Sequence, residues 1–364
     1  MARQKNNFNS KHSYFLSLAF EQAKINLGST SKNPSVGCII EKDGAVISSG
    51  YTSLNGRPHA EFNALHKKRN FSNANLYVTL EPCSHYGITP PCTDIIIKKK
   101  IKKVFFSSYD NDIRSRKKTK KILNKKQIFV KGSLLKKKGK NFYQSYYLQH
   151  NKQLPLIDCK IAISKDYYTN NLRKKWITNK YSRKRSHLIR SMYNCIVSTS
   201  KSINKDDSLL NCRIEGLENK SPDLVIIDRK LRLKKNLTLF KFIKNRKVLL
   251  FTSSKNKKKI FFFKKKGLNI ISIKTLDKKN DYKNLFFNLK EKGYSRIFVE
   301  SGLTFINFLI QNKFINNIYV FRSDTNLKKR GINYSTSNII KKIYLKNKVN
   351  VNLFGDQLYK ERLK

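Results

Sequence analysis

Three side chains of the types that bind zinc lie close to one carboxylate in the N-terminal half of the chain. His59 and Glu61 belong to the triplet His59-Ala60-Glu61, and Cys83 and Cys92 follow in a polar, turn-rich segment. Zinc bound by one imidazole and two thiolates has a fourth tetrahedral position open to water. The metal lowers the pKa of that water toward neutrality, so the set predicts hydrolytic chemistry.

The position of Glu61 suits it to proton transfer. It lies two residues after His59 at the start of the same predicted helix, where its carboxylate can reach the water without binding the metal. Its predicted role is to take a proton from the attacking water and deliver it to leaving ammonia. The pattern H-x-E followed by P-C-x-x-C is the signature of zinc-dependent base deaminases. If His59 and Glu61 only began a helix, the two later Pro-Cys pairs would be coincidence.

The spacing of the cysteines departs from that signature. Residues 84–91 separate Cys83 from Cys92, where the general pattern has two residues. This insertion is rich in turn formers, so we predict a loop that lets both sulfurs face one ion. Cys92 precedes a predicted helix, whose N-terminal N–H groups favour a thiolate.

The N-terminal half has the alternating pattern of an α/β domain. Asp43-Gly44 is a strong hairpin signal between two strand-like runs, 36–41 and 45–51. The other expected elements are helices at 11–27, 59–69 and from residue 93, strands at 75–80 and 103–108, and a helix–strand pair ending at residue 130. These elements predict one α/β domain around the metal site.

The pattern starts again after a helical stretch at 133–149 and a plausible linker at 151–155. A strand at 156–163, a helix at 180–192 and a strand at 195–199 come first. Further strands are expected at 224–228, 248–252, 270–273, 296–300 and 318–321. We therefore predict two α/β domains, residues 1–150 and residues 151–364.

Composition restricts the remaining possibilities. Lys and Arg number 78 against 23 Asp and Glu, a net charge of +55. This excess is spread along the chain together with Asn and Ile, which favours A·T-rich base composition over nucleic-acid binding as its cause. The chain shows no signal peptide and no apolar run that could span a bilayer, so we expect a cytoplasmic homo-oligomer without a membrane partner. Four of the six cysteines, Cys38, Cys159, Cys195 and Cys212, lie in apolar strand-like runs and are expected to be core residues.

A longer string around the cysteines is more specific than the general signature. TLEPCSHYGITPPC at 79–92, NPSVG at 33–37 and PHAE at 58–61 resemble the bifunctional deaminase/reductase family of riboflavin biosynthesis, which acts on a phosphoribosylamino-pyrimidine. The resemblance implies a cytidine-deaminase-like three-layer α/β/α domain in which Asn33, His85 and Asp110 contact the substrate. Ile88 stands where the family usually has a basic residue.

The resemblance continues in the second half and implies a dihydrofolate-reductase-like α/β domain that binds NADPH. The absence of a GxGxxG string agrees with that fold. KIAIS at 160–164 and Trp176-Ile177-Thr178 carry the likeness. It implies cofactor contacts by Ala162, Trp176, Ser202, Asp206 and Gly302. It implies substrate contacts by Arg190, Leu210, Arg213 and Glu300.

Physical arguments support part of this assignment. Two arginines suit a substrate phosphate, because the guanidinium fork matches phosphate oxygens. Gly302 opens a predicted helix, where backbone N–H groups can meet dinucleotide phosphates. Three departures from the family pattern, at Tyr167, Ser208 and Ser301, bear on how well the reductase works.

The sequence therefore predicts a bifunctional enzyme. Zinc-dependent hydrolysis removes ammonia from 2,5-diamino-6-(5-phosphoribosylamino)pyrimidin-4-one, and hydride from NADPH then converts the ribosyl group to ribityl. Three alternatives remain open: a deaminase with an impaired reductase half, a deaminase of tRNA or nucleosides, and a basic RNA-binding protein with a structural zinc ion. The last would normally need a fourth protein ligand, and none is apparent near Cys83 or Cys92.

Overall fold

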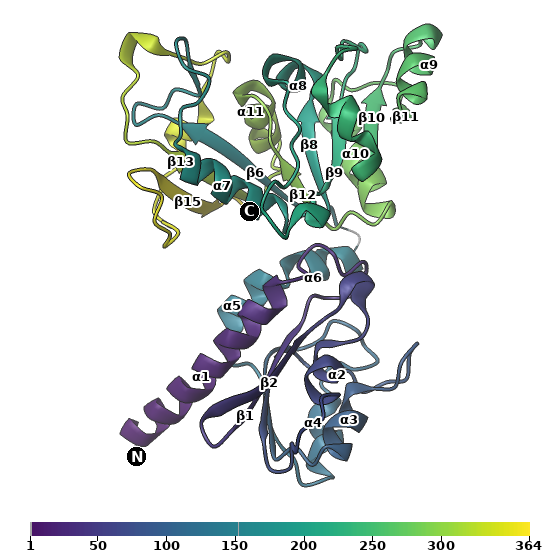
Figure 1. Ribbon diagram of the computed structural model, residues 1–364, viewed down its shortest axis with the longest axis vertical. Coiled ribbons are helices and arrows are strands. Elements are labelled where there is room, and N and C mark those ends of the chain that lie inside the picture. The colour runs from purple at the N-terminus through teal and green to yellow at the C-terminus, as the bar shows by residue number, and fades with distance from the viewer. Residues whose placement is uncertain (1, 152) are drawn as a thin grey trace. The chain divides into compact units, whose positions relative to one another are not determined.

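The computed structural model describes residues 2–151 and 153–364, with side-chain surroundings from residue 10 onward. The chain divides into two compact units, Met1–Gln153 and Leu154–Lys364, called here the N-terminal and C-terminal units. Each unit builds a sheet of its own (Figure 1). Among the helices of the described residues, none combines the length and the apolar character needed to cross a membrane.

The sheet of the N-terminal unit has the strand order β2-β1-β3-β4-β5. The predicted hairpin is confirmed, because β1 (Gly37–Lys42) pairs antiparallel with β2 (Ala45–Tyr51). Strand β3 (Asn75–Leu80) pairs antiparallel with β1 and parallel with β4 (Lys103–Ser108), and β5 (Phe129–Lys131) extends the parallel part. The parallel strands β3 and β4 end at the same edge of the sheet. Three predicted site residues come shortly after these strand ends: Cys83 and His85 after β3, and Asp110 after β4.

Helices cover both faces of this sheet, as the three-layer prediction requires (Figure 1). Two glycines show how closely they pack. A Cβ atom on Gly37 of β1 would lie 1.9 Å from the carbonyl oxygen of Ala19 in α1 (Ala2–Lys24). A Cβ atom on Gly50 of β2 would lie 2.4 Å from the carbonyl oxygen of Ala60 in α2 (Ala60–Leu65). Because Gly50 pairs with Cys38, the neighbour of Gly37, the two glycines face opposite sides of the sheet.

The remaining helices of the N-terminal unit are short. They are α3 (Cys92–Lys98), α4 (Thr119–Asn124), α5 (Lys136–Phe142) and α6 (Gln144–His150). Between the sheet and its helices lies a core of aliphatic and aromatic side chains, including Phe20, Tyr77 and Phe105. His12, for which the sequence favoured a surface or packing role, is buried and stacks on Phe105 with 3.9 Å between ring centroids.

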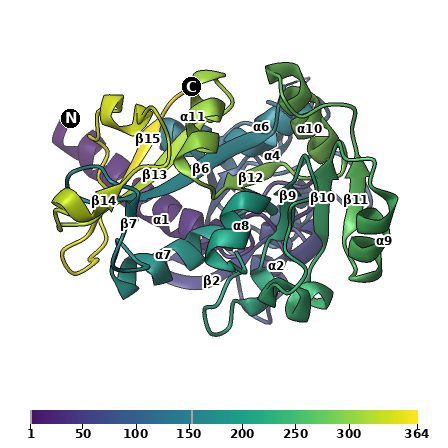
Figure 2. The same ribbon diagram turned by 90° about the horizontal axis from the view of Figure 1, so that it is seen from above.

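The C-terminal unit contains an eight-stranded sheet of order β11-β10-β9-β8-β12-β6-β13-β15. All neighbours are parallel except β15, which runs antiparallel to β13. The strands are β6 (Leu156–Ile163), β8 (Cys195–Thr199), β9 (Asp223–Ile227), β10 (Val248–Thr252), β11 (Asn269–Ser272), β12 (Arg296–Val299), β13 (Asn317–Arg322) and β15 (Gln357–Arg362). Figure 2 follows this sheet from β11 and β10 on the right to β13 and β15 on the left.

Both faces of this sheet are buried, which explains its nearly continuous apolar strands. One face packs on α10 (Lys279–Glu291) and α11 (Leu303–Gln311) through a cluster that includes Phe286 and Ile306. The other packs on α7 (Lys180–Arg190), α8 (Ser200–Asp206) and α9 (Lys257–Lys265) through a second cluster. A separate two-stranded sheet, β7 (Asn170–Asn171) with β14 (Gly331–Ile332), is not part of the eight-stranded sheet.

The structure corrects several of the sequence predictions. The helix expected at 11–27 begins at Ala2 and ends at Lys24, and β15 was not predicted. The helix expected at 59–69 ends at Leu65, and the helical stretch at 133–149 divides into α5 and α6. Cys212 is buried as expected but lies in a loop after α8 rather than in a strand. The predicted α/β class is confirmed for both units.

Candidate functional site

The three candidate metal ligands come from the starts of two helices and the end of one strand. His59 is the residue that precedes the first turn of α2, and Cys92 is the first residue of α3. Strand β3 ends at Leu80, and the chain then continues through Glu81 and Pro82 to Cys83. Helices α2 and α3 contact each other, which brings the starts of both toward the strand end.

The donor atoms have the separations that a zinc ion needs. The Nδ1 atom of His59 lies 3.6 Å from the sulfur of Cys83 and 3.4 Å from the sulfur of Cys92. A tetrahedral zinc ion with ordinary Zn–N and Zn–S bonds separates such ligand atoms by about 3.6 Å. The three donor atoms all lie within 4.8 Å of one another, and within the described chain no further His, Cys, Asp or Glu joins the group. The residues therefore fit a zinc ion with one open position.

Glu61 lies beside this group and is 4% exposed. Burial raises the pKa of Glu61 to about 7, and the neighbouring Cys83 acts in the same direction. The two thiols differ, because hydrogen bonding with Cys92 and His59 lowers the pKa of Cys83, whereas the pKa of Cys92 is raised. A buried carboxyl of this kind is suited to carrying a proton near neutral pH.

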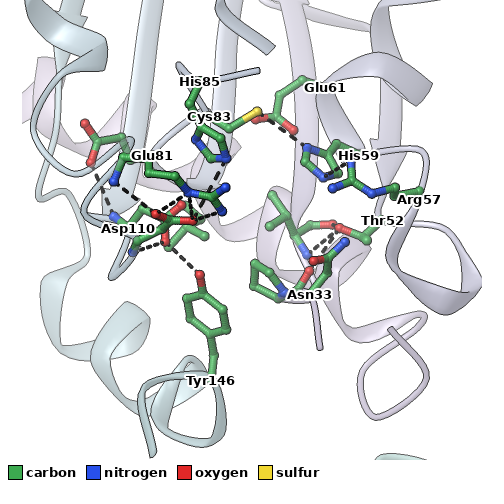
Figure 3. A pocket seen from close by; sticks show the side chains of 15 residues that line it. Asn33, Thr52, Arg57, His59, Glu61, Glu81, Cys83, His85, Asp110 and Tyr146 are labelled. Atoms are coloured by element: carbon green, nitrogen blue, oxygen red, sulfur yellow. Dashed lines mark hydrogen bonds and ion pairs between the residues drawn. The ribbon is translucent and has the colours of Figure 1, made fainter. Parts of the chain in front are cut away.

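A pocket that opens to solvent lies next to the metal ligands (Figure 3). Its lining includes all three substrate residues predicted from the sequence, Asn33, His85 and Asp110. The other lining residues are Pro34, Val36, Thr52, Arg57, His59, Glu61, Leu80, Glu81, Cys83, Asp112, Arg114 and Tyr146. The structure thus places the predicted N-terminal site residues around one cavity, except Cys92, which does not line it and whose sulfur lies 3.4 Å from His59 Nδ1.

Sequence reasoning missed several residues of this pocket. Figure 3 shows Tyr146 of α6 pointing at Asp110, and its hydroxyl donates to Asp110 Oδ1 at 2.8 Å. Burial raises the pKa of Asp110, and the hydrogen bond from Tyr146 opposes this shift. Glu81 Oε2 accepts from the backbone N–H groups of Asp110 and Lys117 at 3.3 and 3.0 Å. The only signal for Glu81 was its place in the TLEPC string, and Tyr146 lies far from any motif.

The predicted reductase residues gather at the carboxyl ends of the parallel strands of the C-terminal unit. Ala162 is near the end of β6, Glu300 directly follows β12, and Ser202 lies in α8, which begins after β8. Strands β8, β12 and β6 are adjacent, so these residues share one edge of the sheet. In open parallel sheets this edge is where ligands bind.

Arg190 and Glu300, both predicted from the sequence to contact the substrate, form an ion pair with each other. Arg190 Nε and Nη2 donate to the two carboxylate oxygens of Glu300 at 2.6 and 3.0 Å. Arg190 Nη1 also donates to the backbone carbonyl of Asn211, between Leu210 and Arg213. The guanidinium fork of Arg190, which the sequence analysis assigned to phosphate, is used for a buried carboxylate. Arg213 Nη1 donates to the side chain of Asn211, and its backbone N–H donates to His187 Nδ1.

The candidate cofactor residues form a group rich in donors. The hydroxyl of Ser202 lies 3.0 Å from that of Ser301 and accepts from the backbone N–H of Gly302, which precedes α11, at 3.0 Å. Asp206 ends α8, and Lys175 donates to its carbonyl oxygen at 3.4 Å. Trp176 is 54% exposed, with Lys175 and Arg183 against its ring. Hydroxyls, a helix N-terminus and an accessible indole fit a dinucleotide cofactor such as NADPH.

One departure from the family pattern has a visible structural effect. Tyr167 adopts a left-handed backbone conformation with φ of 67°, which glycine adopts without strain and other residues rarely adopt. Its carbonyl accepts hydrogen bonds from Asn333 and Asn338, which hold the turn. Ser208 lies in the loop after α8, and Ser301 contributes its hydroxyl to the Ser202 group.

Comparison with known families assigns each unit. The cytidine and deoxycytidylate deaminase zinc-binding region matches residues 9–108, and the RibD C-terminal domain matches residues 155–323. Crystal structures with similar folds include RibD of Acinetobacter baumannii, with a TM-score of 0.77 and 25% identity over 97% of this chain and 98% of that one. The diaminohydroxyphosphoribosylaminopyrimidine deaminase/5-amino-6-(5-phosphoribosylamino)uracil reductase of Thermotoga maritima has a TM-score of 0.78 and 26% identity over 98% and 99%.

Curated relatives agree with this assignment over most of the chain. The riboflavin biosynthesis protein RibD of Actinobacillus pleuropneumoniae is 30% identical over 310 residues, which cover 84% of this chain and 82% of the relative. That of Aquifex aeolicus is 31% identical over 311 residues, covering 84% and 85%. The chain therefore belongs to the family of bifunctional riboflavin-biosynthesis enzymes, which join a zinc-dependent deaminase to an NADPH-dependent reductase.

Proposed function

We propose that residues 1–150 deaminate 2,5-diamino-6-(5-phosphoribosylamino)pyrimidin-4-one and that residues 151–364 reduce the product. The observation that carries the deaminase half is the convergence of His59, Cys83 and Cys92 beside the buried carboxyl of Glu61, next to a pocket that opens to solvent. Zinc, when bound, supplies the Lewis acidity that makes water a nucleophile near neutral pH.

The protein side chains divide the work of deamination. His59, Cys83 and Cys92 would hold the metal. Glu61 would take a proton on its carboxylate and give it to the nitrogen that leaves as ammonia. Asn33, His85 and Asp110 would orient the pyrimidine and its sugar, a role supported by their shared position around the pocket.

In the reductase half, NADPH, when bound, would supply the hydride that reduces the sugar at C1′. We propose that Ala162, Trp176, Ser202, Asp206 and Gly302 bind the cofactor, and that Arg190, Leu210, Arg213 and Glu300 bind the substrate. The ion pair between Arg190 and Glu300 supports a shared role, in which Arg190 fixes the carboxylate while Arg213 meets the phosphate.

A two-signal assay tests the whole proposal. With the pyrimidine substrate and no NADPH, ammonia should still be released, while the absorbance at about 340 nm, which reports NADPH, should stay constant. With NADPH present, one NADPH should be consumed for each ammonia released. If ammonia release required NADPH, or if neither signal changed, the proposal would be wrong.

A second candidate function is a deaminase whose reductase half is impaired. The left-handed backbone at Tyr167 favours an impaired reductase. The turn at Tyr167 comes directly after β6, at the edge of the sheet where we propose that the sugar binds. Supplying the deaminated intermediate directly with NADPH separates the two cases. Oxidation of NADPH supports the bifunctional enzyme, and its absence beside normal ammonia release supports the impaired one.

The hydrogen bond from Tyr146 gives a further prediction. Replacing Tyr146 with Phe removes the hydroxyl that donates to Asp110 at 2.8 Å but retains the ring. Since a hydrogen bond to a charged group contributes about 1.5–3 kcal/mol, we expect the KM for deamination to rise about tenfold or more with a smaller change in kcat.

The matched control is Tyr147→Phe on the same helix, whose hydroxyl donates to the backbone carbonyl of Tyr109 at 3.3 Å. Steady-state kinetics of ammonia release measure both variants. Equal effects of the two substitutions would show that Tyr146 only stabilises α6.

The proposal also includes self-association of this chain into a homo-oligomer in the cytoplasm, with no nucleic-acid or membrane partner. Sedimentation velocity of the purified full chain measures its association state.

A further inference from the structure

Ile88 stands where the family resemblance implies a basic residue. Ile88 is 87% exposed and is not part of the pocket lining. Two arginines do line the pocket, Arg57 from the loop before α2 and Arg114 from the loop after β4. Either could receive the phosphate group of the substrate, and their surroundings distinguish them.

The charge of Arg114 is already neutralised. Its Nη2 lies 2.5 Å from Asp112 Oδ2, and its Nε lies 3.0 and 3.1 Å from the two carboxylate oxygens. This contact lowers the pKa of Asp112 to about 2. The side chain of Arg114 is also 61% exposed, so solvent screens it. A phosphate there would have to compete with a carboxylate.

Arg57 has only uncharged partners. Its Nη1 donates to the hydroxyl of Thr89 at 2.6 Å and lies 3.5 Å from His59 Nε2. Among the ion pairs formed by the described residues, none involves Arg57. Because Nδ1 of His59 faces the two sulfurs, Nε2 is the nitrogen that carries the ring hydrogen when the metal is held. Two donors therefore face each other, an arrangement that an anion would relieve.

Gly87 lies beside both the Arg57 guanidinium and the ring of His85. A Cβ atom on Gly87 would lie 3.8 Å from Arg57 Nη2 and 3.9 Å from His85 Nε2. The hydroxyl of Ser115 accepts from the Ser84 N–H at 2.9 Å and lies 2.7 Å from His85 Nδ1. Donation of the Ser115 hydrogen to Nδ1 leaves His85 Nε2 as an N–H donor. Arg57 Nη2 and His85 Nε2 thus both lie near Gly87, and His85 Nε2 also lies 4.0 Å from Asp112 Oδ2, whereas Arg57 has no carboxylate partner among the described residues.

We propose that Arg57, with His85 near it beside Gly87, binds the phosphate group of the deaminase substrate. The inference rests on the proposed deaminase function and adds the determinant of its phosphate specificity. A guanidinium without a carboxylate partner, tied to a loop by Thr89, is a preorganised phosphate ligand.

The test compares two substrates and one inert anion on the zinc-loaded full chain. Arg57→Ala should raise the KM for the phosphorylated substrate about 10- to 100-fold, since hydrogen bonds between charged groups have that strength. The KM for the dephosphorylated ribosyl compound should change by less than about threefold, and Arg57→Lys should retain part of the preference. Inorganic phosphate should raise the melting temperature of the unaltered protein and have less effect on Arg57→Ala, a readout independent of turnover.

Arg116→Ala is the matched control, because Arg116 is an exposed arginine of the same unit that does not line the pocket. It removes the same charge and should leave both KM values unchanged. An equal rise in KM for both substrates, or loss of zinc from Arg57→Ala, would overturn the inference. Arg57 would then act only by positioning His59. A phosphate-specific loss in Arg114→Ala instead of Arg57→Ala would also overturn it. If the unaltered enzyme deaminates neither compound, the proposed function itself has failed, and the inference fails with it.

Discussion

Replacing Glu61 with Gln is expected to lower the turnover of deamination by about 10²- to 10⁴-fold, the usual contribution of a positioned acid–base group. Glutamine has nearly the same size but cannot accept and release the proton. The side chain is buried beside the metal ligands, so solvent water has little access to take over the transfer. Ammonia release measures this loss.

Two measurements separate proton transfer from metal binding. Glu61→Gln should retain about one zinc ion per chain and unchanged NADPH oxidation with the deaminated intermediate, because Glu61 is not one of the ligand group. His59→Ala should lose both zinc and ammonia release while the reductase activity persists. If Glu61→Gln kept full turnover, the proton-shuttle role would be excluded.

Breaking the ion pair in the C-terminal unit should have the largest effect on stability. Arg190→Ala leaves Glu300, 8% exposed, with Lys160 as its nearest cation at 4.0 Å. Removing one partner of a buried ion pair costs about 3–5 kcal/mol of the free energy of unfolding, and the remaining Lys160 places the expected loss at the lower end of this range. We also expect NADPH oxidation to fall at least about 100-fold, because Arg190 orients the carboxylate at the substrate edge of the sheet.

Trp176, the only tryptophan of the chain, lies in this unit, so denaturant unfolding followed by its fluorescence reports on the affected half. The double variant Arg190→Ala/Glu300→Ala should be less destabilised than the sum of the two single variants, which isolates the pair. Ammonia release should persist in all three as the internal control. Single-variant losses below about 1 kcal/mol would show that the pair adds little.

The same pair predicts a dependence on pH. Burial alone raises the pKa of Glu300, but Arg190 and Lys160 outweigh it and hold the pKa below its usual range. The ionised form therefore contributes stability above the pKa of the unfolded chain, and this contribution is lost as the pH falls through the lower folded value. The stability difference between the unaltered protein and Arg190→Ala should shrink below about pH 4.

Sequence patterns predicted most elements because local physics determines them. The strands at 75–80, 103–108, 156–163 and 195–199 have the predicted bounds, since each is a short apolar run between turn formers. Strand β15 (Gln357–Arg362) was not predicted, because its pattern is mainly polar. Glu361 in that strand is buried only because it accepts hydrogen bonds from Lys346 and Asn347.

The residues of the candidate site likewise fall into those that the sequence could assign and those that it could not. Residues inside the motifs, such as His59, Glu61 and Cys83, could be assigned because their chemistry and spacing are local. Tyr146 could not, since it meets Asp110 only after α5 and α6 have packed against the sheet. The pairing of Arg190 with Glu300 joins residues 110 positions apart, and no pattern along the chain indicates that separation.

The contact between Gly50 and helix α2 bears on how this enzyme can change over time. There the main chain of the helix rests directly on the main chain of the strand, with no side chain between them. The distance of His59 and Glu61 from the sheet is therefore set by this backbone contact and not by the apolar side chains that fill the rest of the core. A lineage can exchange isoleucine for leucine or valine throughout that interior and retain its catalyst, whereas a single methyl group at position 50 would displace the first turn that carries it.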